Sequence, residues 1–231
     1  MTNAKAADLV RSARDRGRNA LSEHESKQVL AAYGIPVTRE GLARDEAEAV
    51  SLAEELGYPV ALKACSAELM HKSEQEAVLL NLSDPEAVRR GAARILASAP
   101  APLDGILVQE MVPGNRELVM GLTRDPQFGP CVMLGLGGVM TEILEDTTFR
   151  VAPFDAAEAG EMTRELRASA LLGPFRGQSA ADLESLCRAL VAMGRIGLEL
   201  DLVAELDVNP VIITPQGGIV AADALVVLGK E

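Results

Sequence analysis

Apolar and polar positions follow two different periods along the chain, and the changes of period divide it into predicted helices and strands. Apolar residues recurring every three or four positions predict helices near 5–19, 22–33, 45–56, 84–98, 155–171 and 181–198. Short apolar or alternating runs predict strands near 60–64, 77–82, 105–112, 117–122, 131–139, 147–151, 202–208, 210–214 and 218–228. Helices and strands therefore mix along the whole length.

Turn and capping signals decide how these elements connect. Ser22 and Glu25 match a capping box at the start of the second helix, which Gly34 and Pro36 end. The last strands are joined by a tight Pro-Gln-Gly-Gly turn at 215–218, which requires antiparallel pairing and disfavours a doubly wound sheet. We therefore predict an α/β (α+β) protein of two lobes.

The predicted division places an N-terminal helical extension at 1–20, one lobe at 21–108 and a second at 109–231. The connection between the lobes is expected within 109–114, where the strand GILVQEMV gives way to Pro-Gly.

Composition narrows the functional classes. The chain has 231 residues, is 48% hydrophobic with no Trp and 3% aromatics, and carries a net charge of -12. The negative charge and the scarcity of stacking rings argue against nucleic-acid binding. Neither an apolar leader nor a membrane-length apolar run occurs, so we expect a cytoplasmic protein with no membrane partner. The three cysteines are widely spaced and predict reduced, buried side chains.

The glycine-rich segment GLGGVM at 135–140 does not match a known phosphate loop. Met140 stands where a dinucleotide fingerprint needs its third glycine, and the chain has no Walker A sequence. The segment is typical of a turn at a strand end, with a backbone anion site as the alternative.

Carboxylates and an amide share one face of the strand VAELDVNP. Glu205, Asp207 and Asn209 alternate with apolar residues, and a hairpin centred on Gln216 would place Asn209 opposite Asp223. Such an oxygen-only face suits Mg²⁺ held together with phosphates, although a solvated acidic face has the same pattern. Asp223 favours the metal, because it lies within a nearly apolar segment.

A second polar group interrupts the segment ALKACSAELMHKSEQEAVLLNL. Lys63 follows an apolar strand, where its ammonium group must reach either water or an anion. His71 and Lys72 come eight and nine residues later. A surface-loop histidine is one interpretation of His71. The other is phosphoryl transfer, which needs cations for the phosphate oxygens, a metal and a nucleophilic imidazole.

Five segments together resemble the ATP-grasp domain, or β subunit, of ADP-forming acyl-CoA synthetases of the acetate–CoA ligase type, which are related to succinyl-CoA synthetase. They are LSEHESKQVLAAYGIPVTRE, GYPVALKACSAELMHKSE, ILVQEMVPGNRELVMGLTRDPQFGP, LGLGGVMTEILEDTTFRVAPF and ELDVNP followed by AADA. The likeness extends in order from about 21 to 228. It implies an ATP-grasp fold with nucleotide bound between two α+β lobes.

The resemblance also implies roles for particular residues. Lys63 would contact the phosphates of ATP or ADP, and the 110–112 segment would be a hinge whose backbone meets adenine, with Glu110 and Val112 among the nucleotide-binding residues. Glu117 would face the ribose. His71 would carry the phosphoryl group away from ATP.

The metal ligands that the resemblance implies lie near the C-terminus. Asn209 and Asp223 would bind Mg²⁺ with Asp207 and Glu205 close by. Glu142 matches a family acid to which the sequence assigns no role.

One position departs from the family pattern. After His71-Lys72-Ser73 the family continues to a glycine pair or Gly-Ala before Val, whereas this chain has Glu76 and Ala77. A carboxylate at Glu76 could repel the γ-phosphate. This departure leaves open a nucleotide-binding or regulatory subunit without catalysis. A separate alternative is a different ATP-grasp ligase that uses no histidine carrier, but the HKS segment and the RDPQFGP and GLGGVMTE strings argue against it.

The resemblance further implies a partner. The chain has no CoA-binding domain, so acyl-CoA formation would need an α subunit that carries the CoA-binding and ligase domains and most of the CoA and carboxylic-acid sites. The expected assembly is a heterotetramer or a similar hetero-oligomer.

Overall fold

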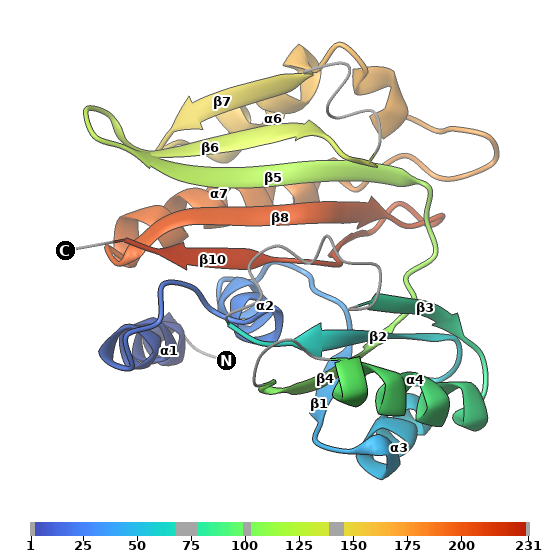
Figure 1. Cartoon of the computed structure of the whole chain (residues 1–231). Helices are drawn as coiled ribbons and strands as arrows, with labels where there is room; N and C mark the ends of the chain where they lie inside the picture. Colours follow the sequence, from blue (N-terminus) through green and yellow to red (C-terminus); the bar gives the residue numbers. More distant parts are fainter. Residues whose placement is uncertain (1–2, 68–77, 99–102, 139–145, 230–231) are drawn as a thin grey trace. The chain divides into compact units, whose positions relative to one another are not determined.

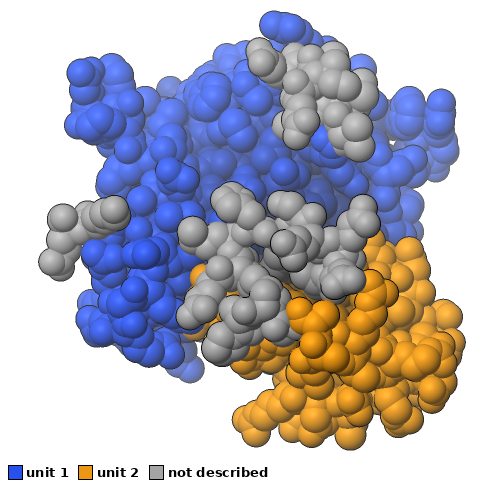
Figure 2. All heavy atoms as spheres, viewed as in Figure 1, with its two compact units in different colours: residues 1–21, 26–37, 112–231 blue, residues 22–25, 38–111 orange. Residues whose placement is uncertain are grey.

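A computed structural model describes residues 3–67, 78–98, 103–138 and 146–229. These residues form two compact units, which Figure 2 colours separately. Unit 1 contains residues 1–21, 26–37 and 112–231, and unit 2 contains residues 22–25 and 38–111. The backbone changes unit between Met111 and Val112, inside the 109–114 segment.

Unit 2 is an antiparallel sheet covered by two helices (Figure 1). The strand order is β1-β4-β2-β3, with β1 at Glu40–Ala43, β4 at Gly105–Glu110, β2 at Val60–Cys65 and β3 at Val78–Leu82. The helices are α3 (Glu46–Leu56) and α4 (Pro85–Ser98). The Asp45 side chain caps α3 by accepting hydrogen bonds from the N–H groups of Ala47 and Glu48.

The alternation of side chains along β2 determines which residues lie on each face of this sheet. Val60, Leu62 and Ala64 pack into one buried cluster with residues of α3 and α4. Because successive side chains of a strand point to opposite faces, Lys63 must lie on the other face of the sheet. β2 is nevertheless buried along its whole length, so that second face is also covered.

Unit 1 contains a larger antiparallel sheet with the order β10-β8-β5-β6-β7, and β9 also pairs with β8 (Figure 1). The strands are β5 (Arg116–Asp125), β6 (Gly129–Leu136), β7 (Thr147–Val151), β8 (Val203–Ile213), β9 (Ile219–Ala221) and β10 (Leu225–Leu228). Its helical elements are α1 (Asn3–Asp15), α6 (Ala156–Glu165), the short 3₁₀ helix η2 (Ser169–Leu172) and α7 (Leu183–Glu199). Helix α2 (Glu23–Ala32) begins in unit 2 and continues in unit 1.

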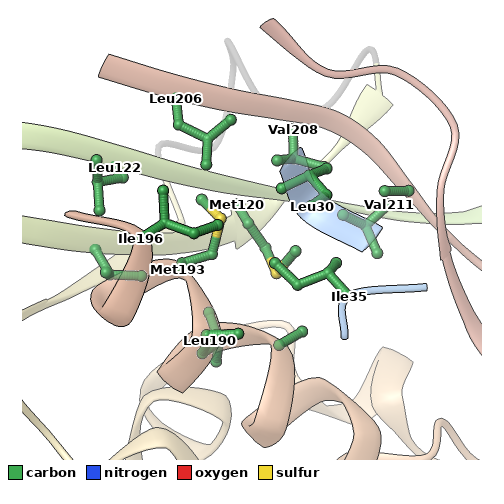
Figure 3. Close-up of a cluster of buried hydrophobic side chains, with 14 of the residues drawn as sticks. Leu30, Ile35, Met120, Leu122, Leu190, Met193, Ile196, Leu206, Val208 and Val211 are labelled. Atoms are coloured by element: carbon green, nitrogen blue, oxygen red, sulfur yellow. The ribbon is translucent and has the colours of Figure 1, made fainter. Parts of the chain in front are cut away.

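One aliphatic core holds unit 1 together. Figure 3 shows Met120 and Leu122 of β5 beside residues of α7 and β8, with Leu30 of α2 and Ile35 in the same cluster. All are buried, and burying each large aliphatic side chain stabilises the fold by about 1.5–3 kcal/mol. Because this core occupies one face of the sheet, the alternate residues of β8 lie on the opposite face.

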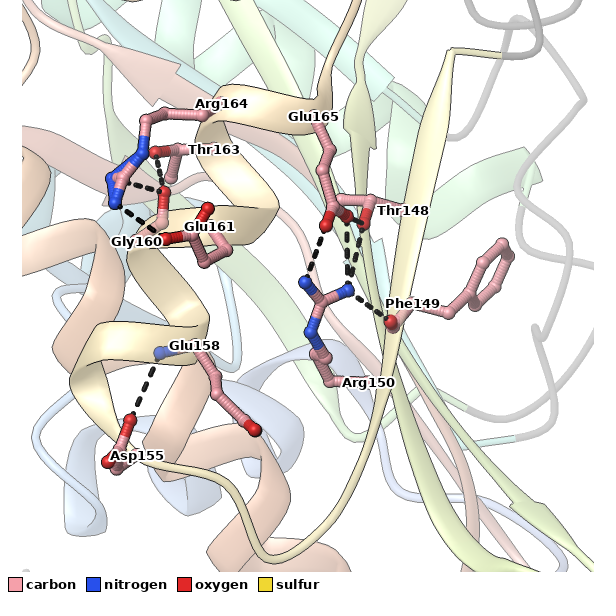
Figure 4. Close-up of polar contacts among 10 residues, drawn as sticks. All are labelled: Thr148, Phe149, Arg150, Asp155, Glu158, Gly160, Glu161, Thr163, Arg164 and Glu165. Carbon is pink, nitrogen blue, oxygen red and sulfur yellow. Dashed lines mark hydrogen bonds and ion pairs between the residues drawn. The ribbon is translucent and has the colours of Figure 1, made fainter.

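A polar cluster joins β7 to α6 (Figure 4). Arg150 donates to both carboxylate oxygens of Glu165, at 2.6 and 3.0 Å, and Thr148 donates to Glu165 at 2.5 Å. These hydrogen bonds lower the pKa of Glu165 to about 2, with Arg150 as the main cause and Thr148 as the next. The cluster ties the edge strand to the neighbouring helix.

The predicted α+β class is confirmed, and the differences from the predicted elements are local. The helix expected at 155–171 is two elements, because α6 ends at Glu165 and η2 follows. The strands expected at 202–208 and 210–214 form the single strand β8, whereas the segment 218–228 divides into β9 and β10. Within the described residues, no helix is long and apolar enough to cross a bilayer.

Candidate functional site

Lys63 is buried and does not extend into solvent. It is 6% exposed, and its Nζ lies 2.6 Å from a carboxylate oxygen of Glu23. The sequence left water and an anion as alternatives for this ammonium group, and the structure supplies an anion from the chain itself. The side chain of Glu23 is also buried. The two charges interact strongly at this distance, because the protein interior screens charge poorly.

Glu23 is the residue that sequence reasoning missed. It is the first residue of α2 and lies within the predicted capping box of Ser22 and Glu25, which the structure confirms. The Ser22 N–H donates to Glu25 at 2.9 Å, and the Glu25 N–H donates to the Ser22 hydroxyl at 3.4 Å. The signal that could have found it was Lys63 itself, since a lysine within a buried strand needs a counter-charge.

A second pair lies next to the first. His24 Nδ1 is 2.9 Å from Glu40 on β1, and the Thr38 hydroxyl donates to the other oxygen of Glu40 at 3.2 Å. Adjacent residues of α2 therefore contact two strands of the unit 2 sheet, Glu23 contacting β2 and His24 contacting β1. These contacts explain why the 22–25 segment belongs to unit 2.

The predicted hinge residues lie at the change of unit. The Glu110 carboxylate accepts from the Arg39 N–H at 2.8 Å and from its guanidinium at 2.7 Å, and the Glu110 N–H donates to the Arg39 carbonyl. Val112 is half-buried and is the first residue of the last unit 1 segment. The side chain of Glu110 therefore fixes the end of β4.

The predicted register of the C-terminal hairpin is confirmed on both sides of Asp223. Val211 pairs with Ala221 in β9, Leu225 of β10 pairs with Asp207, and between them the Ala222 N–H donates to the Pro210 carbonyl. The same register places Asn209 opposite Asp223. Asp207 and Asn209 are exposed on the face of β8 that points away from the core.

The electrostatics of this face favour a cation. Loss of hydration within the surrounding protein raises the pKa of Asp207, and repulsion by Asp223 raises it further. Two carboxylates and one amide fit Mg²⁺, which takes one or two carboxylates and completes its octahedron with water and phosphate oxygens. Within the described residues, no group of three or more acidic, histidine or cysteine side chains is placed to hold a metal ion. Because Mg²⁺ takes oxygen ligands from water and phosphate as well as from carboxylates, the three side chains suit a metal that is shared with a phosphate ligand.

Glu117 lies against the glycine-rich segment. Its carbonyl accepts from the Gly137 N–H at 2.8 Å. Gly138 has φ of +74°, and a Cβ there would lie 2.8 Å from a carboxylate oxygen of Glu117. The glycines thus allow the end of β6 to pack against β5 and leave room for the Glu117 side chain. The preceding residue, Arg116, is buried and donates to the carbonyls of Leu171, Gly173 and Ser179, which fixes the start of β5.

The remaining predicted site residues, His71, Lys72, Glu76 and Glu142, lie outside the described residues. Lys63 and Glu110 belong to unit 2, and the structure shows no direct contact between them in the described interactions. The structure does bring together Asp207, Asn209 and Asp223 in unit 1, where Glu117 also lies on the neighbouring strand.

Comparison with known protein families decides the fold family. The ATP-grasp domain matches residues 12–228, which is nearly the whole chain. The chain belongs to the ATP-grasp family. The fold that the sequence resemblance implied is thus confirmed.

Individual relatives are similar to nearly the whole of this chain. The chain is 40% identical over 230 residues to the acetate–CoA ligase [ADP-forming] I subunit beta of Pyrococcus furiosus, covering 97% of this chain and 98% of that protein. It is 38% identical to the acetate–CoA ligase [ADP-forming] I of Archaeoglobus fulgidus, covering 98% of this chain and 33% of that longer protein.

A solved structure matches equally well. It is the dinucleotide-forming acetyl-coenzyme A synthetase 1 of Ca. Korarchaeum cryptofilum in complex with coenzyme A and Mg-AMPPCP, with its phosphohistidine segment pointing towards the nucleotide binding site. The TM-score is 0.86 at 44% identity, with 97% of this chain and all of that chain covered.

Proposed function

We propose that this protein is the ATP-binding subunit of an ADP-forming acyl-CoA synthetase of the acetate–CoA ligase type. The observation that carries the proposal is the full-length similarity to the P. furiosus subunit beta, at 40% identity. The related structure with Mg-AMPPCP supports nucleotide and magnesium as ligands. The buried ammonium of Lys63 and the acidic face of β8 supply the charges that such ligands need.

Each region has a separate task in this proposal. Lys63 contacts the phosphate oxygens of ATP, and the backbone near Glu110 and Val112 meets the base while Glu117 faces the ribose. Asp207, Asn209 and Asp223 hold Mg²⁺, which neutralises charge on the transferred phosphoryl group. The exposed position of Asp207 and the like charge of Asp223 support this assignment.

The chemical step is an in-line displacement. A neutral imidazole nitrogen of His71 attacks the γ-phosphorus of ATP. The N–P bond forms as the bond from phosphorus to the β-γ bridging oxygen breaks, and ADP leaves with that electron pair. In reverse, the same step makes ATP. Phosphohistidine then passes the phosphoryl group to the chemistry that activates a carboxylic acid for thioester formation.

The second half of the reaction requires a partner. The P. furiosus relative is named a subunit, and the A. fulgidus relative contains this region as a third of a longer chain. We infer that an α subunit supplies the CoA-binding and ligase domains to this protein, in a hetero-oligomer.

Phosphoryl labelling of the complex with its partner tests the proposal. The chain has only two histidines, His24 and His71, so the label can be assigned by substitution. With γ-³²P-ATP and Mg²⁺, we expect an acid-labile label on this chain that His71→Ala abolishes. His24→Gln is the matched control and should keep the label. A label that persists in His71→Ala would refute the role of His71.

Glu76 favours one alternative, a subunit that binds nucleotide without turnover. Its carboxylate stands where the resemblance places a glycine. Calorimetry would then show MgADP or MgATP binding while no label forms on either chain of the complex. If Glu76→Gly restores labelling, the carboxylate is the cause of the lost activity.

A further inference from the structure

We propose that Glu23 is a positioning residue for Lys63, holding its ammonium group charged and aimed for phosphoryl transfer. The inference deepens the proposed function and rests on Lys63 being the phosphate ligand. The sequence resemblance assigns Glu23 no role, and the structure alone brings it to Lys63. It acts through Lys63 rather than on the substrate.

The first observation is the pair itself. The Glu23 and Lys63 side chains are 2% and 8% exposed, and their charged atoms lie 2.6 Å apart. They are 40 residues apart in the sequence, so only the fold brings them together. Burial disfavours a charged amine, and a carboxylate at this distance restores the charged form. A lysine that is to bind phosphate in a dry site needs such a neighbour.

The second observation is that Glu23 is held from two directions. The capping box between Ser22 and Glu25 fixes the backbone at the start of α2. His24 next to it is anchored to Glu40 on β1. The Glu23 carboxylate therefore has a defined position over β2, and the Lys63 ammonium is placed to within the length of a hydrogen bond. An exposed lysine with several rotatable bonds would not have this precision.

The expected kinetic signature follows from two opposing effects. Without the carboxylate, the ammonium would be less well placed and less often charged, which weakens contact with phosphate. The same change removes a negative charge that repels phosphate. In the ground state these effects partly offset each other. In the transition state the geometry of the cation matters more, because misplacement of a catalytic group by about 1 Å can cost about 100-fold.

The experiment uses the complex with its partner and compares Glu23→Gln with Glu25→Gln. The control substitution removes the same charge from the same turn of α2, and glutamine can still accept the capping hydrogen bond from the Ser22 N–H. It therefore accounts for the loss of a negative charge at the start of the helix. For Glu23→Gln we expect kcat of phosphoryl transfer to fall about 10- to 100-fold, with the KM for ATP within about threefold. Glu23→Asp keeps the charge but shortens the side chain, and its kcat should be intermediate.

A second readout measures Lys63 without turnover. Acetic anhydride modifies neutral amines, and mass spectrometry of the digested protein gives the extent of labelling at Lys63 relative to exposed Lys5. We expect Glu23→Gln to raise the relative labelling of Lys63 by about threefold or more, since the amine form gains population. Glu25→Gln should leave it unchanged.

The outcomes separate this inference from the proposed function. If the wild-type complex transfers no phosphate, the proposed function fails, and the labelling of Lys63 alone decides whether Glu23 positions it. Unchanged kcat and unchanged labelling in Glu23→Gln would overturn the inference. So would a variant that only melts earlier, with normal kinetics and labelling, because that result indicates a purely structural ion pair.

Discussion

Two regions of the molecule hold the charges expected to meet the nucleotide, and they treat charge in opposite ways. On β2, the Lys63 ammonium is buried and paired with Glu23 at 2.6 Å. On β8, the Asp207 carboxylate lies on the exposed face of the strand, and its pKa is raised by loss of hydration and further by repulsion from Asp223. One region matches opposite charges inside the protein, whereas the other brings like charges together at the surface.

The difference indicates whether the charges of each region are neutralised during folding or on ligand binding. The lysine is placed during folding, because breaking a buried pair leaves an uncompensated charge. The carboxylates gain their most favourable neighbour only when a cation arrives, so their repulsion favours metal binding. Substitutions should therefore affect stability at β2 and ligand binding at β8.

The largest effect is expected from Lys63→Met. This variant leaves the Glu23 carboxylate buried without the ammonium, and breaking such a pair typically costs about 3–5 kcal/mol of unfolding free energy. Urea unfolding measures the loss, and phosphoryl labelling should fall to background. The double variant Lys63→Met/Glu23→Gln should regain most of the stability and none of the labelling. If the single variant is as stable as the wild type, the buried pair is not a folding contact.

At β8, we expect Asp207→Asn to weaken ligand binding without lowering stability. In EDTA at pH 7 we expect this variant to be at least as stable as the wild type, because it removes a repelled carboxylate. With Mg²⁺, the stabilisation of the protein by ADP should fall, corresponding to about 10- to 100-fold weaker MgADP binding. Thermal melts at several Mg²⁺ concentrations measure both. Equal Mg²⁺ responses in wild type and variant would exclude Asp207 as a ligand.

The pH dependence of stability gives a second test of the β8 region. The raised pKa means that folded Asp207 holds a proton more tightly than the unfolded chain does. In EDTA, the wild type should therefore lose stability relative to Asp207→Asn as the pH rises through that raised pKa. Matched urea titrations from pH 4 to pH 7 test the sign. A difference that grows as the pH falls would contradict it.

A smaller effect is expected at the glycine that borders Glu117. Gly138→Ala places a Cβ 2.8 Å from the Glu117 carboxylate and requires an alanine at φ of +74°. The left-handed backbone alone costs about 1 kcal/mol. Urea unfolding gives this loss, and nucleotide affinity should also weaken if Glu117 faces the ribose. Gly129→Ala is the control, since Gly129 has φ of +81° with no atom near its Cβ position.

The smallest effect is expected away from the site, at Glu165→Gln. The pKa of Glu165 is lowered from 4.5 to about 2 by Arg150 and Thr148, so its contribution is present above pH 4.5 and is lost as the pH falls towards 2. Because Glu165 is exposed and Arg150 is partly exposed, solvent screens the pair. Stability curves of wild type and variant should converge on acidification, and labelling should be unaffected.

The sequence predicted the parts of this molecule that local rules determine. The Asn209–Asp223 register followed from a turn centred on Gln216, because a tight antiparallel hairpin leaves no freedom in pairing. The capping box at Ser22 and Glu25 is equally local. The 155–171 segment was harder, since the break after Glu165 interrupts an otherwise continuous helical pattern.

Glu23 lay beyond these rules for a different reason. Its partner is 40 residues away, and Glu23 and His24 look alike as solvated charges at a helix start. Only the fold reveals that Glu23 contacts β2 and His24 contacts β1. Likewise, the sequence showed that Lys63 needed water or an anion, but long-range packing decided between them.

The discontinuity of unit 2 limits how the protein can be divided. Residues 22–25 reach it from a segment that otherwise belongs to unit 1, so no continuous stretch of chain consists of this unit alone. A fragment cut at 38–111 would keep the sheet but lose the carboxylate over Lys63 and the imidazole beside Glu40. Gene fusion, limited proteolysis or domain exchange at the apparent lobe boundary would therefore separate the lysine from the residue that holds it. The natural module for recombination is the whole chain.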